Sequence, residues 1–303
     1  MDAEHAPYKG RISHYKPIAK GYARLDALRS GRTVRDSPAA MLRPSHALAS
    51  LLALAVPATS FAAASPRSFK GEYTVSYLGL SIARATFSSR YEGDSYAIDG
   101  TVSAAGLGRL FDDTKGTISS KGTISGKQMQ PHAFRADYTS GKKASMVDIR
   151  FNNGAVTSTQ VVPAPKKRDP KSWVPVGDSD LKSVLDPMAA TVIHADSLDK
   201  VCGRTVKFYD GEMRADLTLT YASNGSISVP GYKGDTVTCK MGFEPVAGYR
   251  KGRKALNFLK NKSRMLVTFA PVGQSGVYAP IRATVGTQIG PLTISARRFE
   301  AVD

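Results

Sequence analysis

The strongest constraint on the fold is an alternation of apolar and polar side chains with a period of two. Between residues 72 and 77, Tyr73, Val75 and Tyr77 alternate with three polar residues, as in a strand that buries one face. The same alternation recurs in the runs 83–87, 96–102, 147–151, 217–221, 237–243, 265–269 and 281–285. Glycine and asparagine turns separate the runs at intervals of roughly ten residues.

Short alternating runs joined by tight turns predict an antiparallel meander with one apolar and one polar face. Open twisted sheets rarely exceed about ten strands, so a sheet of this length must curl or split. We therefore expect one all-β domain over residues 66–303. Its curled antiparallel sheet is an open barrel or β-spiral, and one or two short helices accompany it.

One region breaks the β pattern. The segment from Pro163 to Asp178 contains four prolines and cannot form a central strand, because proline donates no ladder hydrogen bond. We expect this loop, together with the short helices, to plug or cover the edge of the sheet. A helix is expected over Asp180–Ile193, where Asp186 is positioned to cap a turn that begins at Pro187. A second short turn is expected over 107–112.

Residues 41–64 have the features of a secretory signal peptide. Arg43 supplies the positive charge, Ala47–Val56 is a short apolar stretch, and Pro57 precedes small residues that suit signal peptidase. The stretch is too short for a membrane span, which needs roughly 20 apolar residues. Residues 1–40 are interpreted as a spurious extension before a true start at Met41; the alternative is a genuine disordered leader. The mature chain is expected in the periplasm, with no transmembrane span.

The chain has two cysteines, Cys202 and Cys239. An even number of cysteines in an exported protein favours a disulfide, and the spacing excludes a CxxC redox motif. Zinc is not expected, because a structural zinc site needs four ligands.

Two basic segments are candidate surfaces for contact with a ligand or partner. The first combines Trp173 with Lys166, Lys167 and Arg168, and the second contains Arg250, Lys251, Arg253 and Lys254. Cations around an apolar centre are able to dock on an anionic membrane. The alternatives are a loop packed over the sheet by its indole and a solvated excursion between strands.

No catalytic motif is present. Only His132 and His194 follow the signal peptide, and neither lies in a recognisable motif. Asp210 and Asp216 are candidates for the acid and base of a hydrolase. The alternative is a charged hairpin in which Arg214 pairs with a carboxylate.

Several short pieces resemble exported bacterial proteins of domain-of-unknown-function family 3108. They are Phe69–Tyr73 with Leu78–Ala83, Leu185–Pro187, Cys202–Asp216, and Cys239 leading into Glu244–Tyr249. The resemblance implies an exported protein with an elongated, curled antiparallel sheet. It supplies no catalytic residues.

The net charge also bears on function. After residue 64 the chain carries 33 Lys and Arg against 21 Asp and Glu, which favours anionic surfaces. We expect a non-catalytic periplasmic protein that supports the cell envelope by binding a hydrophobic or anionic component or a protein partner. Envelope lipid, lipopolysaccharide, glycan and envelope protein are the candidate partners; no nucleic acid, cofactor or metal is expected. The alternatives are an envelope glycan or peptide hydrolase and a scaffold for other envelope proteins.

Overall fold

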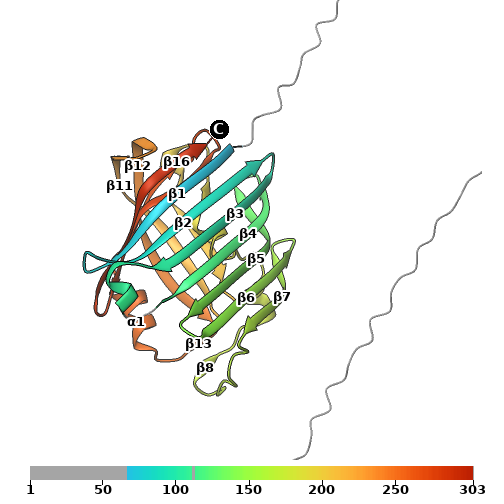
Figure 1. The fold of residues 1–303 in the computed structure, drawn as a ribbon. Helices are drawn as coiled ribbons and strands as arrows, with labels where there is room; N and C mark the ends of the chain where they lie inside the picture. Colours follow the sequence, from blue (N-terminus) through green and yellow to red (C-terminus); the bar gives the residue numbers. More distant parts are fainter. Residues whose placement is uncertain (1–66, 111–112, 303) are drawn as a thin grey trace, which may run out of the picture. The chain divides into compact units, whose positions relative to one another are not determined.

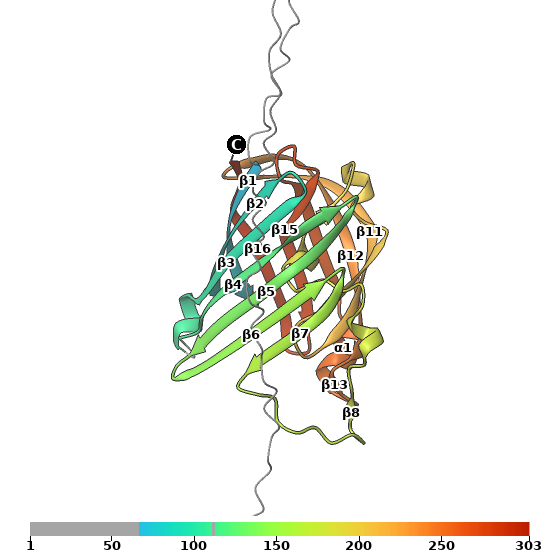
Figure 2. The same cartoon turned by 90° about the vertical axis from the view of Figure 1, so that its right-hand side faces the viewer.

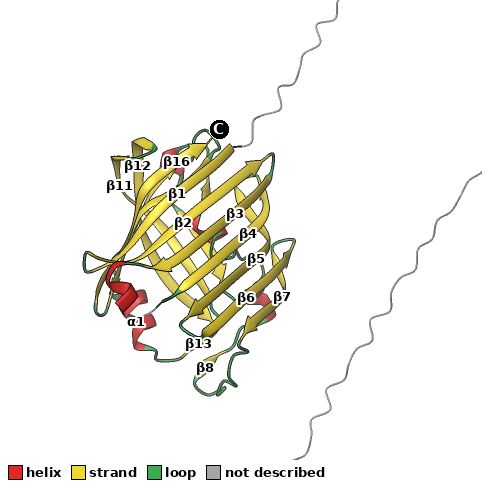
Figure 3. Cartoon of the chain, viewed as in Figure 1, coloured by secondary structure: helices red, strands yellow, loops and turns green. Residues whose placement is uncertain are grey.

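The computed structural model describes residues 67–110 and 113–302. The interpreted extension (1–40) and signal peptide (41–64) therefore lie outside the described residues. Strands account for most of the described chain (Figure 3), and 14 of them form one large sheet. The predicted all-β class and curled antiparallel sheet are confirmed.

The large sheet consists of two meanders. The first contains β1 (Arg67–Tyr77), β2 (Leu80–Glu92), β3 (Ser95–Ala104), β4 (Lys115–Ser125), β5 (Gln128–Ser140), β6 (Lys143–Asn152) and β7 (Ala155–Val162). The second contains β10 (Arg204–Tyr209), β11 (Arg214–Val229), β12 (Tyr232–Ala247), β14 (Met265–Pro271), β15 (Val277–Thr287) and β16 (Gly290–Val302). Pairing of β16 with β1 joins the two meanders, so β10 and β7 are the outermost strands.

The sheet curls around its inner face (Figures 1 and 2). Accumulated strand twist favours this curl in a sheet of many strands. The turn between β1 and β2, the turn between β15 and β16, and the helix α1 (Lys254–Asn261) lie at the left and lower left of the sheet in Figure 1, and we call this side the lower end. The C-terminus lies at the opposite, upper end.

Aromatic rings on the inner face lie over glycines of the neighbouring strands. The three cross-strand pairs are Phe87 with Gly100, Tyr96 with Gly122, and Tyr138 with Gly116. A Cβ atom added to Gly100 would lie 2.5 Å from Cδ1 of Phe87. The missing side chain therefore makes room for the ring, and this helps the wall to bend inward.

The gap between the two outermost strands is bridged by the chain that precedes β10. The Leu185 amide donates to the Lys207 carbonyl at 2.8 Å, and the Tyr209 amide donates to the Leu185 carbonyl at 2.9 Å. On the other side, the Val184 amide donates to the Gly154 carbonyl at 3.3 Å, at the turn between β6 and β7. These bonds satisfy backbone groups that an open edge would leave unpaired.

After this bridge the chain enters the space enclosed by the sheet. Asp186 is fully buried, and its carboxylate accepts a hydrogen bond from the Ser120 hydroxyl of β4 at 2.7 Å. The short 3₁₀ turn η3 (Ala189–Thr191) follows, and β9 (Ile193–His194) then pairs with β15. We call residues 184–195 the plug. The short helices and the proline-rich loop were both expected to plug or cover the edge of the sheet; the plug comes from the segment where the helix was expected, and not from the proline-rich loop.

The predicted helix over Asp180–Ile193 is wrong. The structure has two 3₁₀ turns there, η2 (Asp178–Leu181) and η3, separated by Ser183 in the left-handed region with φ 54°. Pro187 also disfavours a helical conformation at the residue before it. Asp186 does cap the turn as predicted, because its carboxylate accepts the amides of Met188 and Ala189 at 2.8 and 2.9 Å.

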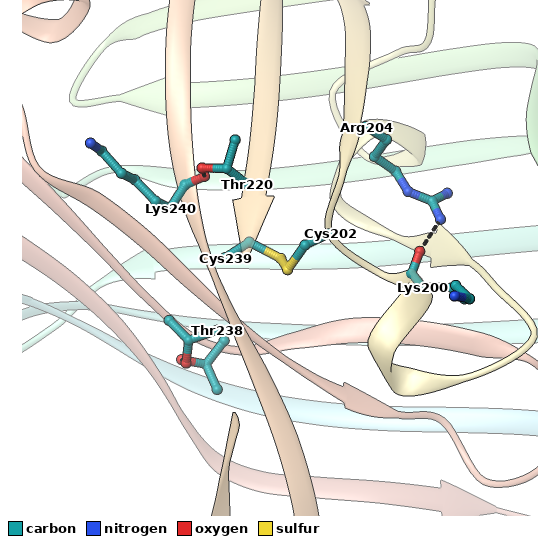
Figure 4. Close-up of a disulfide and its surroundings, with 8 residues drawn as sticks. Lys200, Cys202, Arg204, Thr220, Thr238, Cys239 and Lys240 are labelled. Carbon is teal, nitrogen blue, oxygen red and sulfur yellow. Dashed lines mark hydrogen bonds between the residues drawn. A yellow bond between two sulfur atoms is a disulfide. The ribbon is translucent and has the colours of Figure 1, made fainter. Parts of the chain in front are cut away.

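Cys202 and Cys239 form the predicted disulfide (Figure 4). Their Cα atoms are 5.7 Å apart, and Cys239 is fully buried on β12. Cys202 follows the 3₁₀ turn η4 (Leu198–Lys200), so the bond ties the chain that leaves the plug to the wall of the sheet.

The remaining elements lie outside the large sheet. A second, two-stranded sheet pairs β8 (Trp173–Val174) with β13 (Tyr249–Arg250). The 3₁₀ turn η1 (Gly106–Leu110) covers most of the second predicted turn, and residues 111–112 lie outside the described residues. The basic segment after β13 contains the helix α1. The sequence predicted no helix there, only a solvated excursion or a membrane-docking segment.

Candidate ligand-binding site

An apolar cavity of about 340 Å³ lies between the plug and the inner face of the sheet. Its walls come from β1–β3, β10–β12 and β14–β16, and η3 with the residues beside it forms one side. Representative lining residues are Tyr73, Phe87, Leu217, Met241, Val267 and Ile294. The volume is within the range of about 300–1,000 Å³ that is typical of small-molecule pockets.

The cavity exists because the inner face is not filled. Phe87, Met241 and Ile294 point inward by strand alternation, yet each stays partly exposed. Phe69 and Phe299, on the same sheet toward the upper end, are buried, and their ring centroids are 4.6 Å apart. Phe69 also lines the cavity, so the hollow beside the plug ends where this ring packs against Phe299.

Besides hydroxyl groups, the polar residues that line the cavity include one charged residue, Arg282. The Tyr73 hydroxyl donates to the Pro280 carbonyl at 2.9 Å, so its ring is held against the wall. Burial raises the pKa of Tyr91 to about 12, with Ser89 acting weakly in the opposite direction. Arg282 is exposed and pairs in register with Thr268 of the outer face, so its charge points away from the cavity. The lining favours a neutral, apolar group.

Asp186 organises the plug next to this cavity. Burial raises the pKa of its carboxyl from 3.8 to about 6, although hydrogen bonds from the Ala189 amide, the Ser120 hydroxyl and the Met188 amide act in the opposite direction. The carboxylate thus fixes the turn that carries Met188, which lines the cavity. Sequence reasoning identified the cap but not the burial, because the long-range contact with Ser120 has no local signal.

The two basic segments predicted as contact surfaces meet in the small sheet. Trp173 pairs with Arg250 in register, and the Lys251 amide donates to the Ser172 carbonyl at 2.8 Å. The Arg168 guanidinium lies 4.5 Å from the centroid of the Trp173 ring. The two segments, which were predicted separately, therefore form one surface at the lower end.

The other predicted contact residues border this surface. Lys166 and Lys167 are exposed in the proline-rich loop, and Arg253 and Lys254 lie at the start of α1. Besides its contact with the Trp173 ring, the Arg168 guanidinium donates a hydrogen bond to the Glu212 carboxylate at 2.7 Å. Contact with a ligand or partner stays a prediction for all of these residues.

The carboxylates considered for hydrolysis have structural partners. Asp210 accepts the amides of Glu212 and Met213 at 2.9 and 2.7 Å, and so closes its own hairpin. Asp216 lies 2.6 Å from the Arg214 guanidinium, whose side chain is almost fully buried. The charged-hairpin interpretation is confirmed, and these contacts give no support to an acid–base pair.

A second hollow crosses the outer face of β16 and β1–β5. It measures about 740 Å³ and is lined by charged and hydroxyl side chains. Its charges largely neutralise one another: Arg135 binds Asp137 through two bonds of 2.8 Å, and Arg298 binds Glu300 at 2.9 Å. The inner cavity is the better candidate, because its lining has no competing partners of this kind.

The fold and the cavity define a class of protein: a curled antiparallel sheet with an internal plug and an apolar chamber beside it. The chain belongs to the family described as "Protein of unknown function (DUF3108)", whose sequence model matches residues 72–297. This confirms the family that the sequence analysis identified.

Comparison with solved structures finds a β-barrel-like protein of domain of unknown function DUF1849 from Brucella abortus. The two are 10% identical, with a TM-score of 0.45, over 78% of this chain and 98% of the other. None of the curated proteins matches the chain. The family and the Brucella protein carry no described activity, so the comparisons give no positive sign of catalysis. Within the described residues, no helix is long and apolar enough to span a membrane.

Proposed function

We propose that this protein is a non-catalytic, exported envelope protein that holds an apolar molecule in the cavity beside its plug. The observation that supports this proposal most strongly is the cavity of about 340 Å³ at the inner face, which is lined by apolar side chains that stay partly exposed. Exposed apolar surface of this kind is costly in water, and a bound apolar group would relieve the cost. Because the lining is largely apolar and the charge of Arg282 points away from the cavity, we propose a hydrocarbon chain of an envelope lipid as the occupant.

Export to an oxidising compartment is part of the same proposal. The disulfide between Cys202 and Cys239 supports it, because disulfides persist outside the reducing cytosol. The features of residues 41–64 support it from the sequence. The hydrolase and scaffold alternatives have no observation that favours them over ligand binding.

The cavity is tested by filling it. Ala190 and Ala283 both line the cavity, and phenylalanine at either position would occupy its space. We expect Ala190→Phe and Ala283→Phe each to weaken binding of a dansyl-labelled fatty acid by about tenfold or more. The measurement is fluorescence titration of the purified protein after extraction of endogenous lipid.

A matched control separates filling from general damage. Ala144 is exposed on β6 and away from the cavity, so Ala144→Phe should bind the labelled fatty acid like the natural chain. Native mass spectrometry of the protein from its own cells should show a bound lipid near one-to-one. Absence of any apolar ligand, together with equal probe binding by all three variants, would contradict the proposal.

A further inference from the structure

Exposed apolar side chains gather at the lower end of the curled sheet. Among the described residues, seven large hydrophobic side chains are exposed, and four of them lie in or directly beside the connections between strands at this end. These four are Leu78 (56% exposed), Leu80 (54%), Leu107 (42%) and Ile289 (77%). We call them the apolar tips.

The turns that carry the tips are neighbours in space. The Leu78 amide donates to the Pro291 carbonyl at 3.1 Å, which joins the turn between β1 and β2 to the turn between β15 and β16. Gln288 of the second turn donates its side-chain amide to the Lys254 carbonyl at 3.4 Å, which brings in α1. On the other side η1, which carries Leu107, packs on β2. The tips and α1 therefore form one rim (Figure 1).

Cations flank the tips on the side of α1. Six exposed basic side chains there have no carboxylate partner among the described residues: Arg250, Lys251, Arg253, Lys254, Lys262 and Arg264. Lys260 does have one, since it pairs with Glu244. Near the upper end, the turn between β2 and β3 carries Asp94, Asp235 lies at the start of β12, and the exposed Lys127 is paired with Asp196. Unpaired positive charge therefore lies directly beside the apolar tips.

The turn between β1 and β2 has a leucine, Leu78, at a position where this turn type favours asparagine. Leu78 and Gly79 have φ angles of 49° and 82°, as in a type I′ turn, where Asn-Gly is the favoured pair. Leucine is disfavoured at such a φ, and here its side chain is also exposed to water. The Leu78 side chain packs partly against Gly290 of the neighbouring turn, where an added Cβ atom would lie 2.5 Å from its Cδ2 atom, but 56% of the residue stays exposed. Insertion of this exposed part into an apolar phase would account for a leucine in a turn that disfavours it.

We propose that the lower rim docks on the surface of an anionic lipid bilayer. Apolar tips that project from separate turns would enter the acyl boundary, while the unpaired Lys and Arg side chains meet lipid phosphates. Charge complementarity selects an anionic over a neutral surface. The docking does not require an occupied cavity, so it stands apart from the proposed ligand binding.

The test is co-sedimentation of the full chain with vesicles of phosphatidylcholine alone or mixed with phosphatidylglycerol. We expect binding to the anionic vesicles that falls steeply with salt, and weak binding to the neutral ones. Leu78→Asn combined with Ile289→Ser, and separately Arg253→Glu with Lys254→Glu, should each lower the partition coefficient by about tenfold or more. The matched controls are Tyr221→Ser, an exposed aromatic residue outside the rim, and Lys233→Glu near the upper end.

Leu78→Asn alone distinguishes docking from a structural role. Asparagine suits the turn, so this variant should melt at the same or a higher temperature while binding vesicles less. Equal binding to neutral and anionic vesicles, unchanged binding by the rim variants, or capture of a protein partner without vesicle binding would overturn the inference. Labelled fatty acid binding should persist in the rim variants, so failure of docking is separable from failure of the proposed function.

Discussion

Asp186 shows how one buried carboxyl shapes the plug. It is completely buried, its hydrogen-bond partners are a hydroxyl and two backbone amides, and burial and hydrogen bonds, not a cation, set its pKa. Desolvation therefore outweighs the hydrogen bonds and raises its pKa to about 6. The hydrogen bonds of the cap stabilise the turn, but the buried negative charge of Asp186 destabilises the folded state at neutral pH.

This balance predicts a pH-dependent stability. The folded-state pKa of about 6 exceeds the ordinary value of 3.8, so folding takes up a proton between these values. At 1.36 kcal/mol per pH unit, the free energy of unfolding should fall by about 3 kcal/mol as pH rises from about 4 through 6. Asp186→Asn keeps an acceptor for the two amides and removes the titration.

The measurement is urea unfolding of both chains across this pH range. The difference in unfolding free energy, natural chain minus Asp186→Asn, should decline with rising pH and level off above about 7. Ser120→Ala removes a hydrogen bond that favours the ionised form, so it should move the decline to higher pH. A difference that stays flat with pH would show that Asp186 is not buried in this way.

At the scale of elements, the curvature of the wall depends on glycines beneath aromatic rings. Gly100 faces Phe87 across the β2–β3 pair, and an added methyl group would lie 2.5 Å from the ring. We expect Gly100→Ala to lower the free energy of unfolding by about 1–3 kcal/mol, because the ring must shift within a packed wall.

Gly242→Ala provides the matched control in β12. A Cβ atom there has its nearest neighbour at 3.8 Å, which is an ordinary contact. This variant should be neutral or more stable by up to about 1 kcal/mol, through loss of unfolded-state entropy. Equal effects of the two substitutions in chemical denaturation would argue against the role of the ring.

At the scale of the whole molecule, local patterns predicted some features and missed others. Alternation around Tyr73 and Val237 predicted strands that bury one face, and cysteine number predicted the disulfide. The pairing of β16 with β1 joins residues more than 200 positions apart, so it leaves no local trace. The helix expected over Asp180–Ile193 failed because tertiary bonds to β10 and β4 replaced helical ones.

The candidate site was the least predictable part. An inward residue such as Met241 has the same pattern whether its space is filled or empty, because filling depends on the volumes of residues distant in sequence. The sequence identified each basic segment as a candidate contact surface. It did not predict that the two segments meet, because the pairing of Trp173 with Arg250 depends on the fold. The exposure of Leu78 and Ile289 could not be predicted, because the local sequence does not show whether an apolar turn residue is packed or exposed.

The disulfide between Cys202 and Cys239 gives a prediction about both the compartment of the protein and the anchoring of the plug to the sheet. Cys202 and Cys239 are separated by 37 positions, and closing such a loop stabilises by about 4 kcal/mol in the entropic model. We expect the exported protein to contain no free thiol. A form without residues 41–64, kept in the cytosol, should contain two thiols and be less stable by about this amount.

Thiol labelling before and after reduction, followed by chemical unfolding, measures both quantities. Cys202→Ser with Cys239→Ser should unfold like the reduced natural chain, and added reductant should leave its stability unchanged. Because the bond anchors the exit of the plug to β12, the double variant should also bind the labelled fatty acid more weakly. Free thiols in the envelope fraction would contradict export to an oxidising compartment, whereas full stability without the bond would contradict its role in holding the plug.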